Sequence, residues 1–291
     1  RGGRIRTADP RVPNAVRYRS ALRPEPLQYN ARVIYSQGVR MSVFLDLPEP
    51  GLGVLYVDRP QVRNALDWKA MQSFSQCIQE AQALELNTLV VTGSQNTFIA
   101  GGDLKELARY PSQADGQRLA AEMTNTLRQL EVLPCPTIAA MNGAARGGGA
   151  EISLACDLRV MAEDADMGLV QVNLGLSPGW GAGQRLLGLV GYSLALEWLV
   201  TGKVLSAQEA LHFGLANRIA PPGKALENAL ELARAISVQP RQAVQAIKHL
   251  LRAGQLLAPA SGAAHEQSLF APLWASPEHQ EAVKRFLNRN E

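Results

Sequence analysis

The sequence has few cysteines and histidines and no long apolar run, and each shortage excludes a class of protein. The three cysteines among 291 residues show no CxxC spacing, which argues against a disulfide framework and indicates a reducing compartment. The four histidines form no metal-ligand motif, so no metal site is expected. No uninterrupted apolar stretch reaches roughly 18 residues, so we expect no membrane span. These features predict a globular protein of the cytoplasm.

Basic charge is concentrated in the first forty residues and is scarce elsewhere. Residues 1–40 contain nine arginines against Asp9 and Glu25, a formal charge of +7, and the whole chain is +3, which leaves −4 for residues 41–291. No basic stripe interleaved with aromatic residues follows, so nucleic acid is not an expected partner. With four prolines and no apolar h-region, residues 1–40 are not a secretory signal peptide. We expect a disordered extension or translated upstream sequence there, with an organelle transit peptide as the alternative.

Strand-like runs alternate with helical patterns along the chain from Met41. Strands are predicted over residues 42–47, 53–58, 88–92, 137–141, 157–161 and 217–220. Helices are predicted from 64–67 onward, over 113–132, and over 192–202, 206–213, 222–236, 239–252 and 262–288. The run at 88–92 is apolar throughout, which is typical of a strand buried on both faces. The order predicts an α/β fold with a buried, mostly parallel sheet and a helical tail.

Two glycine-rich corners are the main candidates for chemistry. Gly147-Gly148-Gly149-Ala150-Glu151 precedes an apolar run, and Ala100-Gly101-Gly102-Asp103 follows a strand, with Asp103 suited to cap a helix. Glycines leave backbone amides open to another molecule, and a helix N-terminus presents free N–H groups. Either corner alone is equally explained by tight packing of a helix on a strand. Two such corners whose N–H groups converge on one oxygen form an oxyanion hole.

Motifs for other chemistries are absent. The sequence has no GxSxG, and no serine or cysteine stands at either corner, so it lacks a nucleophile for acyl transfer. GxGxxG spacing and a Walker lysine are also missing, which excludes a Rossmann fingerprint and a P-loop. Enolate chemistry on a carbonyl remains, with Glu151 as the nearby ionisable group.

Further motifs stand in order around these corners. They are Arg59-Pro60, Asn64-Ala65-Leu66, residues 98–104, Asn142-Gly143-Ala144, residues 147–151, Ala155-Cys156-Asp157, residues 174–179, Gln184-Arg185-Leu186, Thr201-Gly202, residues 207–210 and Gly214-Leu215-Ala216. With this set, residues 42–290 resemble the crotonase superfamily, the enoyl-CoA hydratase/isomerase family. The resemblance implies a spiral core of ββα turns over residues 41–200 and a helical trimerisation region over 201–291. It also implies acyl-CoA thioesters as substrates and no cofactor, because CoA is part of the substrate.

The resemblance assigns roles to individual residues. The backbone N–H groups of Gly102 and Gly148 would hold the thioester oxygen, and Glu151 would be the acid/base. Arg63 is either a contact for the CoA phosphates or an ordinary solvated charge, and Trp180 is either a core aromatic or a specificity residue. The other positions expected along the substrate path are Asn64, Ala65, Leu66, Ala100, Asp103 and Leu104.

Gln171 stands where the hydratases of the family have a second glutamate. Hydration needs one group to take a proton from water and one to protonate the α-carbon, and glutamine cannot ionise. Either Glu151 performs both steps, as in an enoyl-CoA hydratase-like enzyme, or the reaction differs. Residues 178–181 are similar to the ethylmalonyl-CoA decarboxylase branch, which also lacks the second glutamate, so decarboxylation of a substituted malonyl-CoA is the alternative. A non-catalytic acyl-CoA-binding protein is the third hypothesis, and a homotrimer or a dimer of trimers is the expected assembly.

Overall fold

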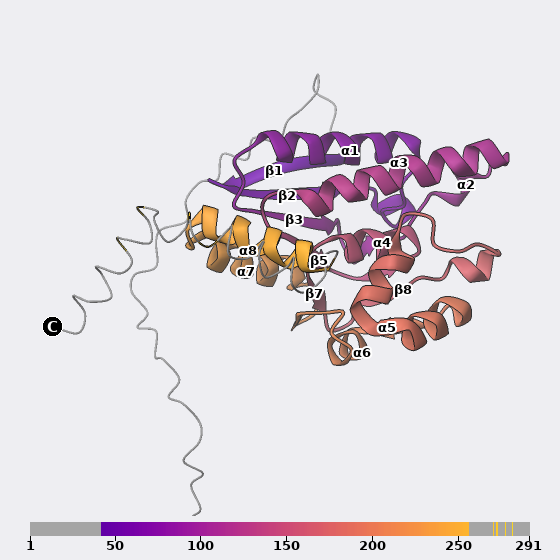
Figure 1. Ribbon diagram of the computed structural model, residues 1–291. Helices are drawn as coiled ribbons and strands as arrows, with labels where there is room; N and C mark the ends of the chain where they lie inside the picture. Colours follow the sequence, from indigo (N-terminus) through magenta and orange to yellow (C-terminus); the bar gives the residue numbers. More distant parts are fainter. Residues whose placement is uncertain (1–41, 256–269, 271, 273–276, 278–280, 282–291) are drawn as a thin grey trace, which may run out of the picture. The chain divides into compact units, whose positions relative to one another are not determined.

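The computed structural model describes residues 42–255 together with 270, 272, 277 and 281, which all belong to a single unit. Strands and helices alternate through the first part of this range, and helices predominate later (Figure 1). The predicted α/β class is therefore confirmed. Residues 1–40 and nearly all of the predicted helix over 262–288 lie outside the described residues.

A six-stranded sheet forms the centre of the unit. It consists of β1 (Val43–Glu49), β2 (Leu52–Val57), β3 (Thr88–Gly93), β5 (Thr137–Met141), β7 (Leu158–Ala162) and β10 (Arg218–Ala220), in that spatial order. The first pair is antiparallel and the other pairs are parallel. All of β3 and β5 is buried, as expected for parallel strands covered on both faces. The sequence predicted each of these six strands.

Alternate residues of each strand belong to two different hydrophobic cores, because successive side chains point to opposite faces of the sheet. On β3, Leu89 and Val91 belong to the larger core with α1 (Trp68–Ala83), and Val90 belongs to the smaller core beneath α7 (Ala225–Ser237). Both β10 and α7 follow residue 200, and they pack directly on the central sheet. The predicted domain boundary at residue 200 stays a prediction.

The structure contains a second sheet of four short strands, of which the sequence predicted only the first. Its order is β4 (Thr97–Ile99), β6 (Ala144–Arg146), β8 (Asp166–Gly168) and β9 (Val204–Ser206). Three residues are too few to show a periodic pattern, and the glycines that flank β6 and the glycine that ends β8 suggest a loop. This sheet positions the site, because both glycine corners lie at the ends of its strands.

The helices differ from the predictions mainly at their starts. The helix expected from residue 64 begins at Trp68, because Asp67 caps α1 by accepting a hydrogen bond from the Ala70 amide at 2.8 Å. The helix expected from residue 192 is the second half of α5 (Ala182–Thr201), which is broken at Gly191, where φ is 77°. The remaining helices are α2 (Leu104–Leu107), α3 (Gln113–Val132), α4 (Gly148–Ala155), α6 (Ala207–His212) and α8 (Arg241–Gly254). Within the described ranges, no helix is long and apolar enough to cross a membrane.

The short helix α4 is buried along its whole length and is fixed at its C-terminal end by Arg159. This arginine, 3% exposed, donates hydrogen bonds to the carbonyl oxygens of Ser153 and Cys156 in and just after the last turn of α4. Its Nε also donates to the carbonyl oxygen of Leu215. A cation at this end satisfies carbonyls that have no partner within the helix. The opposite end of α4 carries the glycine corner.

Candidate active site

Each glycine of the corner at 147–149 is required for a different reason. Gly147 has φ of 49° and ψ of −116°, a conformation that other residues rarely adopt. A Cβ on Gly148 would overlap the indole ring of Trp180, and a Cβ on Gly149 would overlap the carbonyl oxygen of Ile99. The packing explanation therefore holds for Gly149, which lets α4 lie directly on β4. Gly148 is different because it is the first residue of α4, so its N–H has no partner within the helix.

The second corner lies directly against the first. Gly101 has φ of 96°, and a Cβ there would lie 3.1 Å from the backbone nitrogen of Gly148. Around it, the Leu66 amide donates to the Gly101 carbonyl and the Asp103 amide donates to the Leu66 carbonyl, both at 2.8 Å. The amides of Gly102 and Gly148 donate no hydrogen bond to any described group. Two unpartnered N–H groups from adjoining corners are the arrangement that an oxyanion hole requires.

Glu151 lies one turn into α4 and is 2% exposed. Its Oε2 accepts hydrogen bonds from the amides of Trp180 at 2.7 Å and Ala182 at 3.1 Å. Its Oε1 accepts from the Gln171 side chain at 2.8 Å and the Gly179 amide at 3.3 Å. Burial raises the pKa of Glu151 above its ordinary value, and these four hydrogen bonds offset part of the increase. A buried carboxyl group with a raised pKa is suited to accept and return a proton.

Gln171, which the family resemblance places at the position of the second acid, contacts Glu151 directly. Its Nε2 donates to Glu151, which leaves its Oε1 buried with no hydrogen-bond partner among the described residues. An ionised Glu151 favours this orientation, because the flipped amide would place two oxygen atoms against each other. This oxygen can therefore accept a hydrogen bond from a molecule that enters the site.

Trp180 joins the two halves of the site. It is 6% exposed, its amide binds Glu151, and its ring occupies the space beside Gly148. The prediction left a core role and a specificity role open, and the structure shows a buried aromatic that contacts both the carboxylate and the oxyanion corner. The amides of Gly179 and Ala182 were missed by sequence reasoning. The only signal was the glycine-rich turn before α5, since a backbone N–H carries no residue-specific mark.

The residues expected along the CoA path divide into exposed and buried groups. Arg63 and Leu104 are exposed, and Ala100 is partly exposed. Asn64 is fully buried, and its side chain bonds to backbone groups of Arg59, Ser94 and Thr97, so it holds the corner together. Ala65 and Leu66 are also buried.

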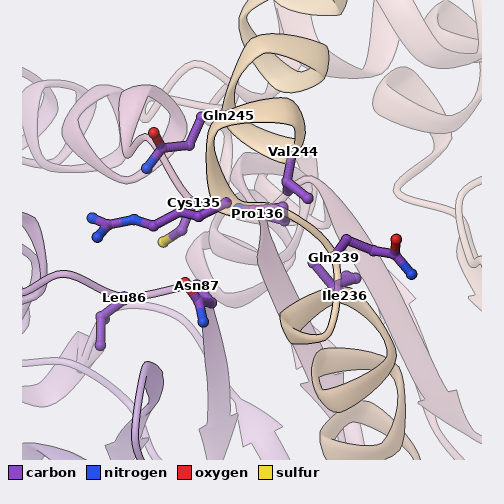
Figure 2. Close-up of a pocket in the computed structure, with 9 residues that line it drawn as sticks. Leu86, Asn87, Cys135, Pro136, Ile236, Gln239, Val244 and Gln245 are labelled. Atoms are coloured by element: carbon purple, nitrogen blue, oxygen red, sulfur yellow. The ribbon is translucent and has the colours of Figure 1, made fainter. Parts of the chain in front are cut away.

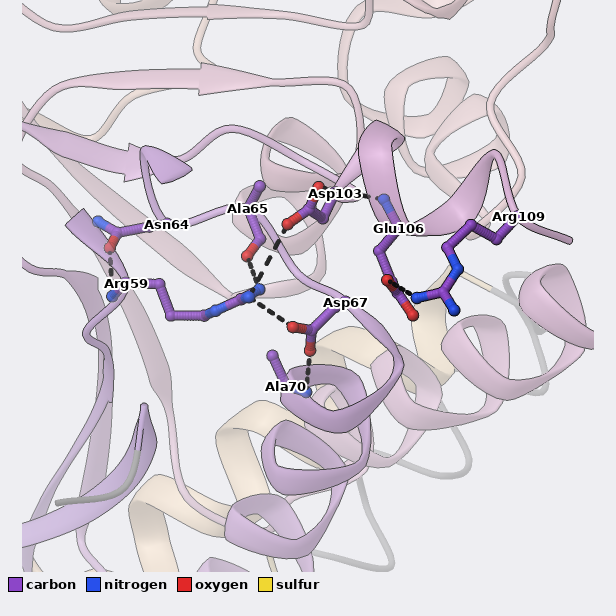
Figure 3. Close-up of polar contacts among 8 residues, drawn as sticks. All are labelled: Arg59, Asn64, Ala65, Asp67, Ala70, Asp103, Glu106 and Arg109. Carbon is purple, nitrogen blue, oxygen red and sulfur yellow. Dashed lines mark hydrogen bonds and ion pairs between the residues drawn. The ribbon is translucent and has the colours of Figure 1, made fainter. Parts of the chain in front are cut away.

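Arg59 organises this region from the buried side, as Figure 3 shows. Its guanidinium donates to the Ala65 carbonyl oxygen, pairs with Asp67, and lies 3.8 Å from Asp103. Asp103 also caps α2. These contacts tie the start of α1 and the start of α2 to the backbone beside Gly102, so we assign Asp103 to the support of the corner.

A small cavity lies away from the glycine corners, at the start of β5 (Figure 2). Its volume of about 10 Å³ accommodates one water molecule at most. Burial raises the pKa of the lining thiol Cys135 to about 11, and the pKa values of Cys77 and Cys156 to about 12. All three are free and buried, so each thiol stays protonated and none is a nucleophile. Among the described residues, no cluster of side chains is suited to a metal ion.

Residues 49–291 match the family model for enoyl-CoA hydratase/isomerase. The chain is 36% identical over 241 residues to the 2,3-dehydroadipyl-CoA hydratase of Escherichia coli K12, and the aligned region covers 81% of this chain and 92% of that protein. It is 31% identical over 249 residues to the ethylmalonyl-CoA decarboxylase of Gallus gallus, and the aligned region covers 84% of this chain and 83% of that protein. The crystal structure of an enoyl-CoA hydratase from Bacillus anthracis has a TM-score of 0.82 at 30% identity, over 86% of this chain and 97% of that chain. The fold expected from the sequence is thereby confirmed.

Proposed function

The chain belongs to the enoyl-CoA hydratase/isomerase family, and from this premise we propose that it adds water to the double bond of an enoyl-CoA thioester. One observation carries the proposal: the unpartnered amides of Gly102 and Gly148 lie in adjoining corners, and Trp180 contacts both Gly148 and the buried carboxyl group of Glu151. The relatives include a 2,3-dehydroadipyl-CoA hydratase and a short-chain-enoyl-CoA hydratase, which supports the same reaction class. The chemistry uses no cofactor besides the CoA portion of the substrate.

The reaction proceeds in two proton transfers. Glu151 takes a proton from a water molecule, whose oxygen forms a bond to the β-carbon of the thioester. The electron pair of the double bond moves toward the carbonyl, and the negative charge on the thioester oxygen is stabilised by the Gly102 and Gly148 amides. Glu151 then returns its proton to the α-carbon. One carboxyl group suffices, because it is ionised before the first step and neutral before the second.

Gln171 supplies the second contact for the water. Its unpartnered Oε1 is an acceptor beside the carboxylate, and a water molecule has two hydrogens to donate. One hydrogen goes to Glu151 and the other to Gln171, which orients the water oxygen toward the substrate. The glutamine thus replaces the orienting role of a second glutamate without its ionisation.

Substitution of Gln171 tests this role. We expect Gln171→Leu to lower kcat for crotonyl-CoA hydration by about tenfold to a hundredfold, because the water loses one of its two contacts. Gln171→Glu restores an acceptor and should stay within about tenfold of the wild type. Gln208→Leu, an exposed position on α6, is the matched control. The reaction is monitored by the loss of absorbance of the conjugated thioester. A hydration rate in Gln171→Leu equal to that of the wild type would remove Gln171 from the mechanism.

Decarboxylation of a substituted malonyl-CoA is the second candidate. It needs the same oxyanion hole but only one proton donor, and among the described residues the neighbour of the Glu151 carboxyl group is Gln171 and not a second acid. The ethylmalonyl-CoA decarboxylases among the relatives support it. Release of CO₂ from ethylmalonyl-CoA with no hydration of crotonyl-CoA would favour this reaction. Acyl-CoA binding without any turnover would instead support a non-catalytic protein.

We propose further that the exposed positions near the corner contact CoA, with Arg63 toward its phosphates and Leu104 along the pantetheine.

The cytoplasmic location expected from the free cysteines also stays a proposal.

The assembly we propose is a homotrimer or a dimer of trimers. Exposed apolar side chains concentrate on η2 (Gln171–Leu174), just after it, and along α5, at Val172, Leu174, Leu176, Leu187, Leu189, Tyr192, Leu196 and Val200. Patches of this kind mark protein interfaces. Light scattering is expected to give the mass of three or six chains, and a double substitution Tyr192→Glu with Leu196→Glu should give smaller species. A monomer at micromolar concentration would contradict the proposal.

A further inference from the structure

The turn that binds Glu151 is itself held from its other side. Peptide groups in residues 179–182 point their N–H groups at the carboxylate. The carbonyl oxygen of Gly179 belongs to the same peptide group as the Trp180 N–H, and it accepts a hydrogen bond from Thr124 on α3 at 3.2 Å. The next carbonyl oxygen, that of Trp180, accepts from Arg185 at 2.7 Å. This turn is therefore clamped between Glu151 and groups that lie behind it.

Arg185 is the strongest member of the clamp. Its Nε donates to Glu131 of α3 at 2.7 Å, and the two side chains are only 12% and 18% exposed. Arg252 of α8 approaches the other oxygen of Glu131 at 3.6 Å. Gly181 has φ of 92°, and a Cβ there would lie 3.0 Å from Arg185 Nη1. The guanidinium thus fills the space behind the turn and links it to α3, and a planar fork suits such a bridge better than an ammonium group.

We propose that Arg185, oriented by Glu131, is a positioning residue that holds Trp180 against both halves of the active site. Trp180 is the one residue that contacts Arg185, Glu151 and Gly148 within the described chain. When the carbonyl of Trp180 is fixed, its amide stays on the carboxylate and its ring stays beside the oxyanion amide. The kinetic part of this proposal rests on the hydration reaction proposed above, while the geometric part does not.

The environment of Glu151 makes the effect measurable. Burial raises the pKa of Glu151, and the groups that lower it are the Ala182, Trp180 and Gly179 amides and the Gln171 side chain. No ionised side chain of the described residues is among these causes. Loss of the clamp therefore reaches the carboxyl group through these amides, and the pKa of Glu151 is expected to rise further when they move away.

Arg185→Met is the principal test, with Glu131→Gln as a milder variant that keeps the arginine and an acceptor for it but removes the negative charge of its partner. We expect kcat for crotonyl-CoA to fall about tenfold to a hundredfold in Arg185→Met with KM changed little, since reacting groups are misplaced while CoA contacts remain. Arg185→Lys should recover part of the loss. Arg234→Met, which breaks an Arg–Glu pair between α7 and β1 far along the chain from the site, is the matched control.

A second readout separates this proposal from the proposed reaction. In protein labelled with ¹³C at glutamate carboxyl groups, the Glu151 signal is assigned by comparison with Glu151→Gln and titrated by NMR. The pKa of Glu151 should be higher in Arg185→Met than in the wild type and Arg234→Met, and it should rise by a smaller amount in Glu131→Gln. An unchanged pKa in folded Arg185→Met or Glu131→Gln would overturn the positioning role. Failure of the wild type to hydrate crotonyl-CoA would reject the reaction and leave the pKa comparison decisive for Arg185.

Discussion

Replacement of Glu151 by glutamine is expected to lower kcat for enoyl-CoA hydration by about a thousandfold with little change in KM. The amide oxygen of glutamine can still accept two of the hydrogen bonds that the carboxylate accepts, but its NH2 group cannot accept the others, and neither group can take a proton from water. Since the side chain is 2% exposed and lies among four hydrogen-bond donors, no other ionisable group of the described residues replaces it. Initial rates with crotonyl-CoA over a range of substrate concentrations measure both constants.

The pH profile provides a second check on Glu151. Burial raises the pKa of Glu151 above that of an ordinary glutamate. As the solution is acidified, the wild-type rate should therefore begin to fall at a higher pH than it would if the pKa were ordinary. The carboxyl group must be ionised to accept the first proton, so activity is lost below this pKa. Glu231→Gln, an exposed position on α7, is the matched control. Wild-type turnover in Glu151→Gln would remove this residue from the proton transfers.

Gly148→Ala is expected to have the second largest effect. The added Cβ would overlap the indole ring of Trp180, so either the ring or the first turn of α4 must move. Such movement takes the Gly148 amide away from the thioester oxygen, and loss of one oxyanion donor lowers kcat by about a hundredfold or more. Overpacking of this kind also lowers the free energy of unfolding by about 1–3 kcal/mol.

The control for this glycine is Gly116→Ala on the exposed side of α3, where nothing lies within 4 Å of an added Cβ. It should leave kcat unchanged, since alanine is accommodated easily in a helix. Thermal unfolding of both variants separates the stability effect from the catalytic one. A folded Gly148→Ala protein with wild-type kcat would show that this amide does not stabilise the transition state.

Much of the fold could be predicted because its signals are local. The six strands of the main sheet are apolar runs with clear boundaries, and the helical pattern over residues 113–132 coincides with α3. The strands β6, β8 and β9 could not be predicted, because three residues carry no periodicity and their pairing depends on distant segments. The start of α1 was placed too early for the same reason. Residues 64–66 are held by Gly101, Ser94 and Thr97, partners that lie about thirty residues or more away.

The candidate site shows the same division. The glycine runs and the nearby carboxylate of Glu151 made the two corners candidates in the sequence, and the family resemblance then assigned the amides of Gly102 and Gly148. The roles of Gly179 and Ala182 were not, since their contributions are backbone N–H groups set by the turn before α5. Arg185 was visible only as part of a family motif. Its function depends on Glu131 and the Trp180 carbonyl, which meet it only in the folded chain.

The most direct test of the account is the mass of the product formed from crotonyl-CoA in water enriched in ¹⁸O. We predict a thioester heavier by one labelled water molecule, formed by the wild type and largely lost in Glu151→Gln. Unchanged crotonyl-CoA, together with CO₂ release when ethylmalonyl-CoA is supplied, would contradict hydration by this site.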